Sequence, residues 1–103
     1  MGDNILNEIR TKLGEEELLC QLAEECAELS KAALKLRRVL SGKNPTPVTE
    51  NQARENLLEE IADVTLCLDA LDLLKEEYAT PIGQICGTKL ARWEKRLAGK
   101  GNL

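Results

Sequence analysis

The chain has 103 residues, which is the size of a single domain, and its formal net charge is −4. Charged residues make up 31% and hydrophobic residues 43%, so the composition is that of a globular protein and excludes a disordered one. The acidic balance argues against general binding of nucleic acid, which needs a basic surface to engage phosphates. Phe is absent and there is one Trp and one Tyr, so the core has to be aliphatic, which favours helices over a β-sandwich.

Four cysteines raise the question of a disulfide framework (Cys20, Cys26, Cys67 and Cys86). No two of them have C-x-x-C spacing, and the first residues lack the basic and apolar regions of a signal peptide. No apolar run approaches the roughly 18 residues of a membrane-spanning helix. We therefore expect a cytoplasmic protein without membrane contact, whose thiols are reduced and mostly buried.

The first half of the chain predicts a short helix and a long helix, separated by Gly14. Apolar residues at i,i+4 spacing predict the short helix from Asn4 to about Lys12. The long helix is expected from Glu15 to about Leu40, with acidic residues in its first turn and basic residues in its last. Its predicted apolar stripe follows spacings of three and four residues and comprises Leu18, Leu22, Cys26, Leu29, Ala33, Leu36 and Leu40.

The second half predicts a loop and two further helices. Residues 41–48 contain Gly and two prolines and predict the loop. Thr49 and Gln52 predict a capping box, and the helix that begins there is expected to run to about Tyr78. Thr80-Pro81 predicts the start of a last helix, which spans Ile82 to about Ala98 and ends at Gly99. The expected fold is all-α, an antiparallel helical bundle of one short and three longer helices in a single domain over residues 1–103.

Two pairs of acidic residues repeat one pattern within the long helices. Glu25 and Glu28 lie three residues apart in the first, and Glu60 and Asp63 lie three residues apart in the second. Residues i and i+3 project from the same face of a helix, so two such helices packed side by side would bring four carboxylates together. Four oxygen ligands suit a hard divalent cation, Mg²⁺ or Mn²⁺. For either pair alone, the simpler interpretation is a solvated helix face.

The position of Glu60 favours the metal interpretation. Glu60 falls within the predicted apolar stripe of its helix, whereas Asp63 and Glu25 lie at the edges of theirs. That stripe is formed by Leu57, Ile61, Val64, Leu68 and Leu71. A buried carboxylate without a partner is costly, so a cation or a strong partner is expected beside it. The chain has no His, which excludes Glu-x-x-His di-iron sites and any His-based catalysis.

A second apolar face on the same helix predicts a partner subunit. Its members lie broadly opposite the first stripe and are Leu58, Ala62, Leu66, Ala70 and Leu73. A helix that is apolar on two sides is buried on two sides, and three or four helices of one small chain do not easily enclose it. We therefore expect a homodimer or homotetramer, with this helix central.

The last helix carries a row of basic residues, Lys89, Arg92 and Arg96, on one side of its apolar stripe. The row suits phosphate oxygens beside a metal, and equally suits favourable charge near a helix C-terminus. Trp93 has two interpretations, a platform for a nucleotide base or an aromatic in the core or an interface. Asn56, one turn before Glu60, is a candidate substrate contact.

The acidic motifs in combination resemble those of a known family. Glu24-Glu25-x-x-Glu28 followed by Glu60-x-x-Asp63 looks like the MazG-like all-α nucleoside triphosphate pyrophosphohydrolases, over residues 18–64. The resemblance implies Mg²⁺-dependent hydrolysis of a (deoxy)nucleoside triphosphate to the monophosphate and pyrophosphate, a house-cleaning activity on nucleotide pools.

The resemblance also implies roles for named residues. Glu25, Glu28, Glu60 and Asp63 would be the catalytic metal ligands, while the row of basic residues would clamp the phosphates. Relatives often carry Asn near the position of Trp93, so this chain departs from the pattern there. Two alternatives stay open, a non-catalytic metal- or nucleotide-binding helical oligomer of the same fold, and a structural bundle with an acidic surface.

Overall fold

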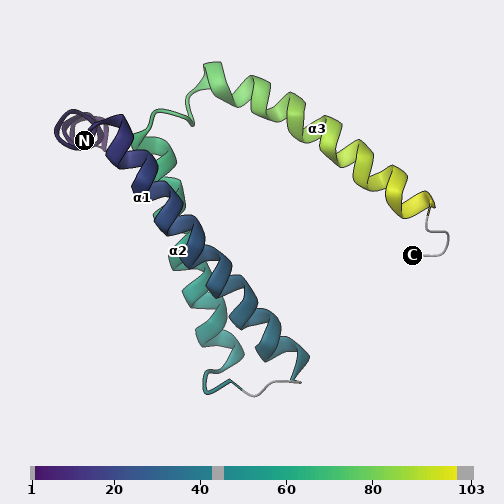
Figure 1. Cartoon of the computed structure of the whole chain (residues 1–103). Helices are drawn as coiled ribbons and strands as arrows, with labels where there is room; N and C mark the ends of the chain where they lie inside the picture. The colour runs from purple at the N-terminus through teal and green to yellow at the C-terminus, as the bar shows by residue number, and fades with distance from the viewer. Residues whose placement is uncertain (1, 43–45, 100–103) are drawn as a thin grey trace. The chain divides into compact units, whose positions relative to one another are not determined.

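The computed structural model describes residues 2–42 and 46–99, with side chains from residue 5 onward (Figure 1). Within these ranges it contains α1 (Gly2–Ser41), α2 (Glu50–Ala70) and α3 (Glu76–Gly99), and no strand. The all-α prediction is therefore confirmed. The chain forms two compact units, Met1–Asp72 and Leu73–Leu103, and each is described by itself. The centre of the predicted loop, residues 43–45, lies outside the described residues.

Gly14 divides α1 into two helical segments. Its backbone has φ 84° and ψ 163°, a combination that is open to Gly and strained for any residue with a Cβ. The helix therefore changes direction there, and the segments on either side match the predicted short helix and long helix. The prediction of a break at this residue is confirmed.

Thr49 caps the start of α2 as its sequence predicts. Its Oγ1 accepts a hydrogen bond from the Gln52 N–H at 3.1 Å, and the Gln52 Oε1 accepts one from the Thr49 N–H at 2.8 Å. This reciprocal capping box satisfies two donors that a helix start leaves without a partner.

The predicted end of this helix at Tyr78 is wrong, because α2 stops at Ala70. Asp72 adopts a left-handed conformation with φ 64°, which no residue within a helix can have. The Lys75 carbonyl then accepts N–H bonds from Tyr78 and Ala79, both at 3.0 Å, and α3 begins at Glu76.

The predicted start of the last helix at Thr80-Pro81 is also wrong, since Pro81 lies inside α3. Pro81 falls in the second turn, where it removes the hydrogen bond that residue 81 would donate to the Glu77 carbonyl, and its ring crowds that carbonyl. α3 does end at Gly99, as predicted.

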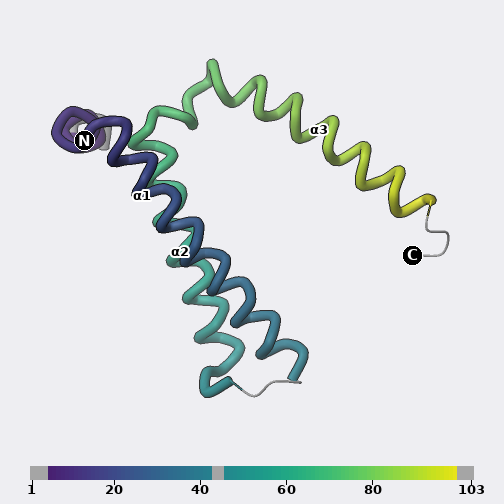
Figure 2. Tube along the Cα trace, in the orientation of Figure 1, coloured from purple at the N-terminus to yellow at the C-terminus, as the bar shows by residue number. Residues whose placement is uncertain are grey.

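α1 and α2 run antiparallel and lie side by side (Figures 1 and 2). Their contact follows residues at alternating spacings of four and three, the pattern of two helices that pack along a shared line. We call these residues the hairpin seam. All are buried or half-buried. They are Leu18, Leu22, Glu25, Leu29, Ala32 and Leu36 on α1, with Ala53, Leu57, Glu60, Val64 and Cys67 on α2 and Leu71 at its C-cap.

The seam corrects the predicted apolar stripes. Cys26, Ala33 and Leu40 were expected to face the core and are exposed, whereas Ala32 is only 2% exposed. Ile61 was placed in the stripe of its helix and is 43% exposed. A helix contacts one neighbour along a narrow strip, and Cys26, Ala33, Leu40 and Ile61 fall outside that strip.

The expectation that the thiols are mostly buried is also wrong. All four cysteines are free, and only Cys67 is buried. On the predicted second face of α2, Leu58 and Leu66 are 65% and 59% exposed, but Ala70 is buried. The hairpin thus leaves large apolar side chains uncovered on this helix.

α3 is a helix whose described residues are all exposed. At its start, the Lys75 Nζ lies 3.1 Å from Glu77 Oε1 and 5.5 Å from the centre of the Tyr78 ring. Large apolar side chains are exposed along its length, including Ile82, Leu90, Trp93 and Leu97. Among the described residues, no helix combines the length and the apolar character needed to cross a membrane.

Candidate metal centre

Two carboxylates occupy positions in the hairpin seam that apolar residues would normally fill. Glu25 lies between Leu22 and Leu29 on α1, and Glu60 lies between Leu57 and Val64 on α2. Both glutamates are half-buried. The same periodicity that packs the two helices therefore brings carboxyl groups from both into one apolar contact.

Three carboxyl groups converge at this point. One oxygen from each of Glu25, Glu60 and Asp63 lies within 4.8 Å of the other two. Two of these residues come from α2 at i,i+3, and the third comes from α1. Among the described residues, no ion pair joins any of the three to a Lys or Arg, so the group carries no compensating cation from the protein.

The pKa of Glu25 is raised above its usual value of 4.5. Burial is the largest cause, because it disfavours the charged carboxylate. A side-chain hydrogen bond with Asp63 and the charge of Asp63 raise the pKa further, and the charge of Glu60 adds to them. The Gln21 Nε2 donates to Glu25 Oε1 at 3.1 Å and opposes the shift.

The pKa of Glu60 is also raised, first by burial and then by the charges of Asp63, Glu28 and Glu59. Its Oε2 is buried and has no hydrogen-bond partner among the described residues. A carboxylate oxygen removed from water without a donor is costly in the ionised form. A cation at this oxygen would remove that cost, so the residues present fit a divalent ion.

Glu28, the fourth predicted ligand, stands apart from this group. Its side chain is 52% exposed, and one of its oxygens lies 3.5 Å from the Lys31 Nζ. Its charge nevertheless raises the pKa of Glu60, so it lies beside the three converging carboxylates. The structure thus brings together three of the four predicted ligands and places the fourth at their edge.

The predicted substrate contacts divide between the two units. Asn56 is half-buried on α2, one turn before Glu60. Lys89, Arg92 and Arg96 belong to α3 in the second unit, where they line one open surface hollow together with Trp93 and Lys95.

Two residues near the carboxylates were missed by the sequence analysis. Gln21 donates a hydrogen bond to Glu25 from one turn earlier on α1. This i,i+4 spacing could have been recognised in the sequence. Cys67 follows Asp63 by one turn, and the pKa of its thiol is raised by burial, then by the charges of Glu25 and Asp63, and by Cys26. The spacing of Cys67 from Asp63 is visible in the sequence, whereas only the register between the helices brings Cys67 near Glu25.

Comparison with known proteins identifies no relative. No family model, curated protein or solved structure matches the chain. The resemblance of the two acidic motifs to the MazG-like family stays a prediction.

Proposed function

We propose that the chain is a Mg²⁺-dependent nucleoside triphosphate pyrophosphohydrolase of the MazG-like kind, with Mn²⁺ as a possible substitute ion. Glu25, Glu60 and Asp63 hold the metal, with Glu28 as a further ligand or a ligand to its waters. The reaction is hydrolysis of a (deoxy)nucleoside triphosphate to the monophosphate and pyrophosphate.

One observation carries the proposal: the buried Oε2 of Glu60, within a group of three carboxylates, has no hydrogen-bond partner in the described part of the chain. A solvated acidic face would keep its oxygens in water and would not occupy the contact between two helices. The two acidic motifs supply the second support, because their order and spacing resemble those of the pyrophosphohydrolases.

A bound divalent ion would neutralise phosphate charge and lower the pKa of a coordinated water. The α–β anhydride bond breaks as a water oxygen attacks the α-phosphorus, and pyrophosphate leaves. The water loses a proton, which a carboxylate not fully used in coordination would accept.

The remaining roles fall to polar and basic side chains. Lys89, Arg92 and Arg96 bind phosphate oxygens in this proposal, and Asn56 contacts the substrate from the turn before Glu60. The exposed apolar residues of α2 and α3 are covered in a homodimer or homotetramer. Light scattering at micromolar concentration tests the oligomer, and a monomer would contradict it.

Pyrophosphate release from a panel of ribo- and deoxynucleoside triphosphates tests the activity. Wild-type protein should release pyrophosphate from at least one of them in Mg²⁺ and from none in EDTA. Glu60→Gln should abolish release, whereas the control Glu55→Gln, an exposed residue on the same helix, should keep it. No release from any nucleotide at high protein concentration would exclude the enzyme.

The second candidate function is a non-catalytic module that binds a metal or a nucleotide. It is favoured by the same three carboxylates, which need only hold the ion. Mg²⁺ binding without pyrophosphate release from the whole panel would select this function. A purely structural bundle predicts neither Mg²⁺ binding nor pyrophosphate release.

A further inference from the structure

The junction between α2 and α3 is broken although its residues favour a helix. Residues 71–75 read Leu-Asp-Leu-Leu-Lys and contain neither Gly nor Pro. The apolar periodicity of α2 continues across them, which is why the sequence predicts one helix to about Tyr78. Asp72 nevertheless adopts φ 64°, a conformation that is unfavourable for most residues with a Cβ. Asp tolerates this conformation better than most residues, and a contact from outside the junction can stabilise it further.

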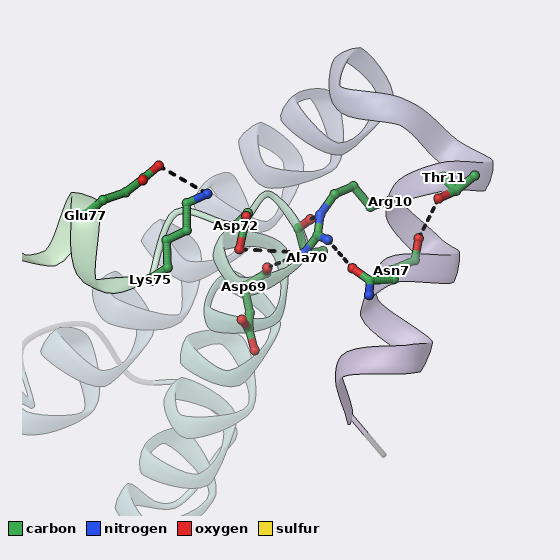
Figure 3. Close-up of polar contacts among 8 residues, drawn as sticks. All are labelled: Asn7, Arg10, Thr11, Asp69, Ala70, Asp72, Lys75 and Glu77. Atoms are coloured by element: carbon green, nitrogen blue, oxygen red, sulfur yellow. Dashed lines mark hydrogen bonds and ion pairs between the residues drawn. The ribbon is translucent and has the colours of Figure 1, made fainter.

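Arg10 supplies that contact from the segment of α1 before Gly14 (Figure 3). Its Nε donates a hydrogen bond to the Ala70 carbonyl at 2.8 Å, and its Nη2 donates to the Asp69 carbonyl at 3.4 Å. The same Nη2 lies 3.9 Å from Oδ1 of Asp72. Asn7, one turn earlier on the same segment, accepts a hydrogen bond from Nη1 and so steadies the guanidinium group.

The carbonyls that Arg10 binds are the ones a longer helix would use. In a continuous helix, the Asp69 carbonyl accepts from the N–H of residue 73 and the Ala70 carbonyl accepts from that of residue 74. In the structure the Asp69 carbonyl accepts from the Asp72 N–H at 2.9 Å, which tightens the last turn. Arg10 replaces the missing donor at Ala70, and its positive charge also suits the C-terminal end of a helix.

We propose that Arg10 is a latch that decides whether α2 ends at Ala70. When Arg10 is bound, the junction is broken at Asp72. When Arg10 is released, residues 71–75 become helical and join α2 to α3. Gly14 lets the segment that carries Arg10 take its own direction and reach the end of α2.

NMR of the full-length chain tests the latch without any assay of activity. The Cα chemical shifts of residues 71–75 distinguish helical from non-helical backbone. We expect non-helical shifts at Asp72 in the wild type and helical shifts across the junction in Arg10→Ala. The control is Lys12→Ala, which removes an exposed cation of the same segment that pairs with Glu8, and it should keep the wild-type shifts.

A second pair of variants keeps the test decisive. Asp72→Gly added to Arg10→Ala should restore the break, because Gly adopts a positive φ freely. Where Arg10→Ala does not fold, Arg10→Lys takes its place, since it keeps the charge but loses the forked donors and should give the same helical shifts. Wild-type shifts at the junction after removal of the Arg10 guanidinium would overturn the proposal, and so would a helical junction in the wild type.

Discussion

One carboxyl oxygen of Glu25 on α1 and one of Asp63 on α2 lie within 4.8 Å of each other across the contact between the two helices. Two carboxylates this close repel each other, since both offer hydrogen-bond acceptors and no donor. Glu60 lies close to both of them, so three carboxyl groups gather in one partly buried site. Ionising all three there is costly, because burial and neighbouring negative charges both disfavour the charged form. Protons or a cation can balance this charge, and in the proposed site a divalent ion would do so near neutral pH without protonating the ligands.

The metal-free protein should lose stability as the pH rises above about 4.5. Burial raises the pKa of both Glu25 and Glu60 in the folded chain above the ordinary value of 4.5. A carboxyl group with a raised folded pKa stabilises the fold below its unfolded pKa, and this contribution is lost as the pH rises through the folded pKa. Urea unfolding in EDTA, repeated from below pH 4.5 to neutral pH, measures how the free energy of unfolding changes with pH.

The double variant Glu25→Gln/Glu60→Gln isolates the contribution of these two groups. It should be more stable than the wild type near neutral pH. Its free energy of unfolding should also lack the pH dependence that Glu25 and Glu60 contribute. The control Glu24→Gln/Glu55→Gln replaces two exposed residues on the same helices and should keep the wild-type slope. Equal slopes for the wild type and the Glu25/Glu60 variant would contradict the raised pKa values.

The hairpin seam is tested by adjacent alanines. Ala32 is 2% exposed in the seam, and its neighbour Ala33 is exposed. Ala32→Leu should destabilise the fold by about 1–3 kcal/mol, because a well-packed contact has no room for added methylenes. Ala33→Leu should change the stability by less than about 0.5 kcal/mol. Chemical denaturation of both variants measures the difference. A larger loss of stability in Ala33→Leu than in Ala32→Leu would contradict the hairpin seam and favour the apolar stripe that the sequence predicted.

The capping box predicts a local effect at the start of α2. Thr49→Ala removes the acceptor of the Gln52 N–H and should cost about 1 kcal/mol. Thr65→Ala is the matched control, because the Thr65 hydroxyl only bonds the Ile61 carbonyl within the helix. Alanine is the better helix former at that interior position, so this control should be neutral or slightly stabilising. Thermal unfolding compares the two, and equal losses would argue against the cap.

The sequence predicted those features that are set within a few residues. Gly14 and the capping box at Thr49 each depend on local backbone chemistry, and both were predicted correctly. The end of α2 was predicted wrongly, and its last carbonyls accept hydrogen bonds from Arg10, a residue whose position beside them depends on tertiary structure.

The candidate site shows the same division. The i,i+3 spacing of Glu60 and Asp63 is local and indicated that they lie together. Glu25 was placed at the edge of the core and in fact lies in the seam, because only the position of the partner helix decides which strip of α1 is covered. Glu28 was predicted as an equal ligand, and its greater exposure depends on that same helix orientation.

Thermal unfolding of the wild type with increasing Mg²⁺ tests the central claim most directly. Binding to the folded chain alone stabilises it by about 2.7 kcal/mol at a concentration one hundred times the Kd, so the melting temperature should rise with Mg²⁺. Glu55→Gln should show the same rise, and Glu60→Gln should show none. A wild-type melting temperature that ignores Mg²⁺, or an equal rise in Glu60→Gln, would contradict a metal centre at Glu25, Glu60 and Asp63.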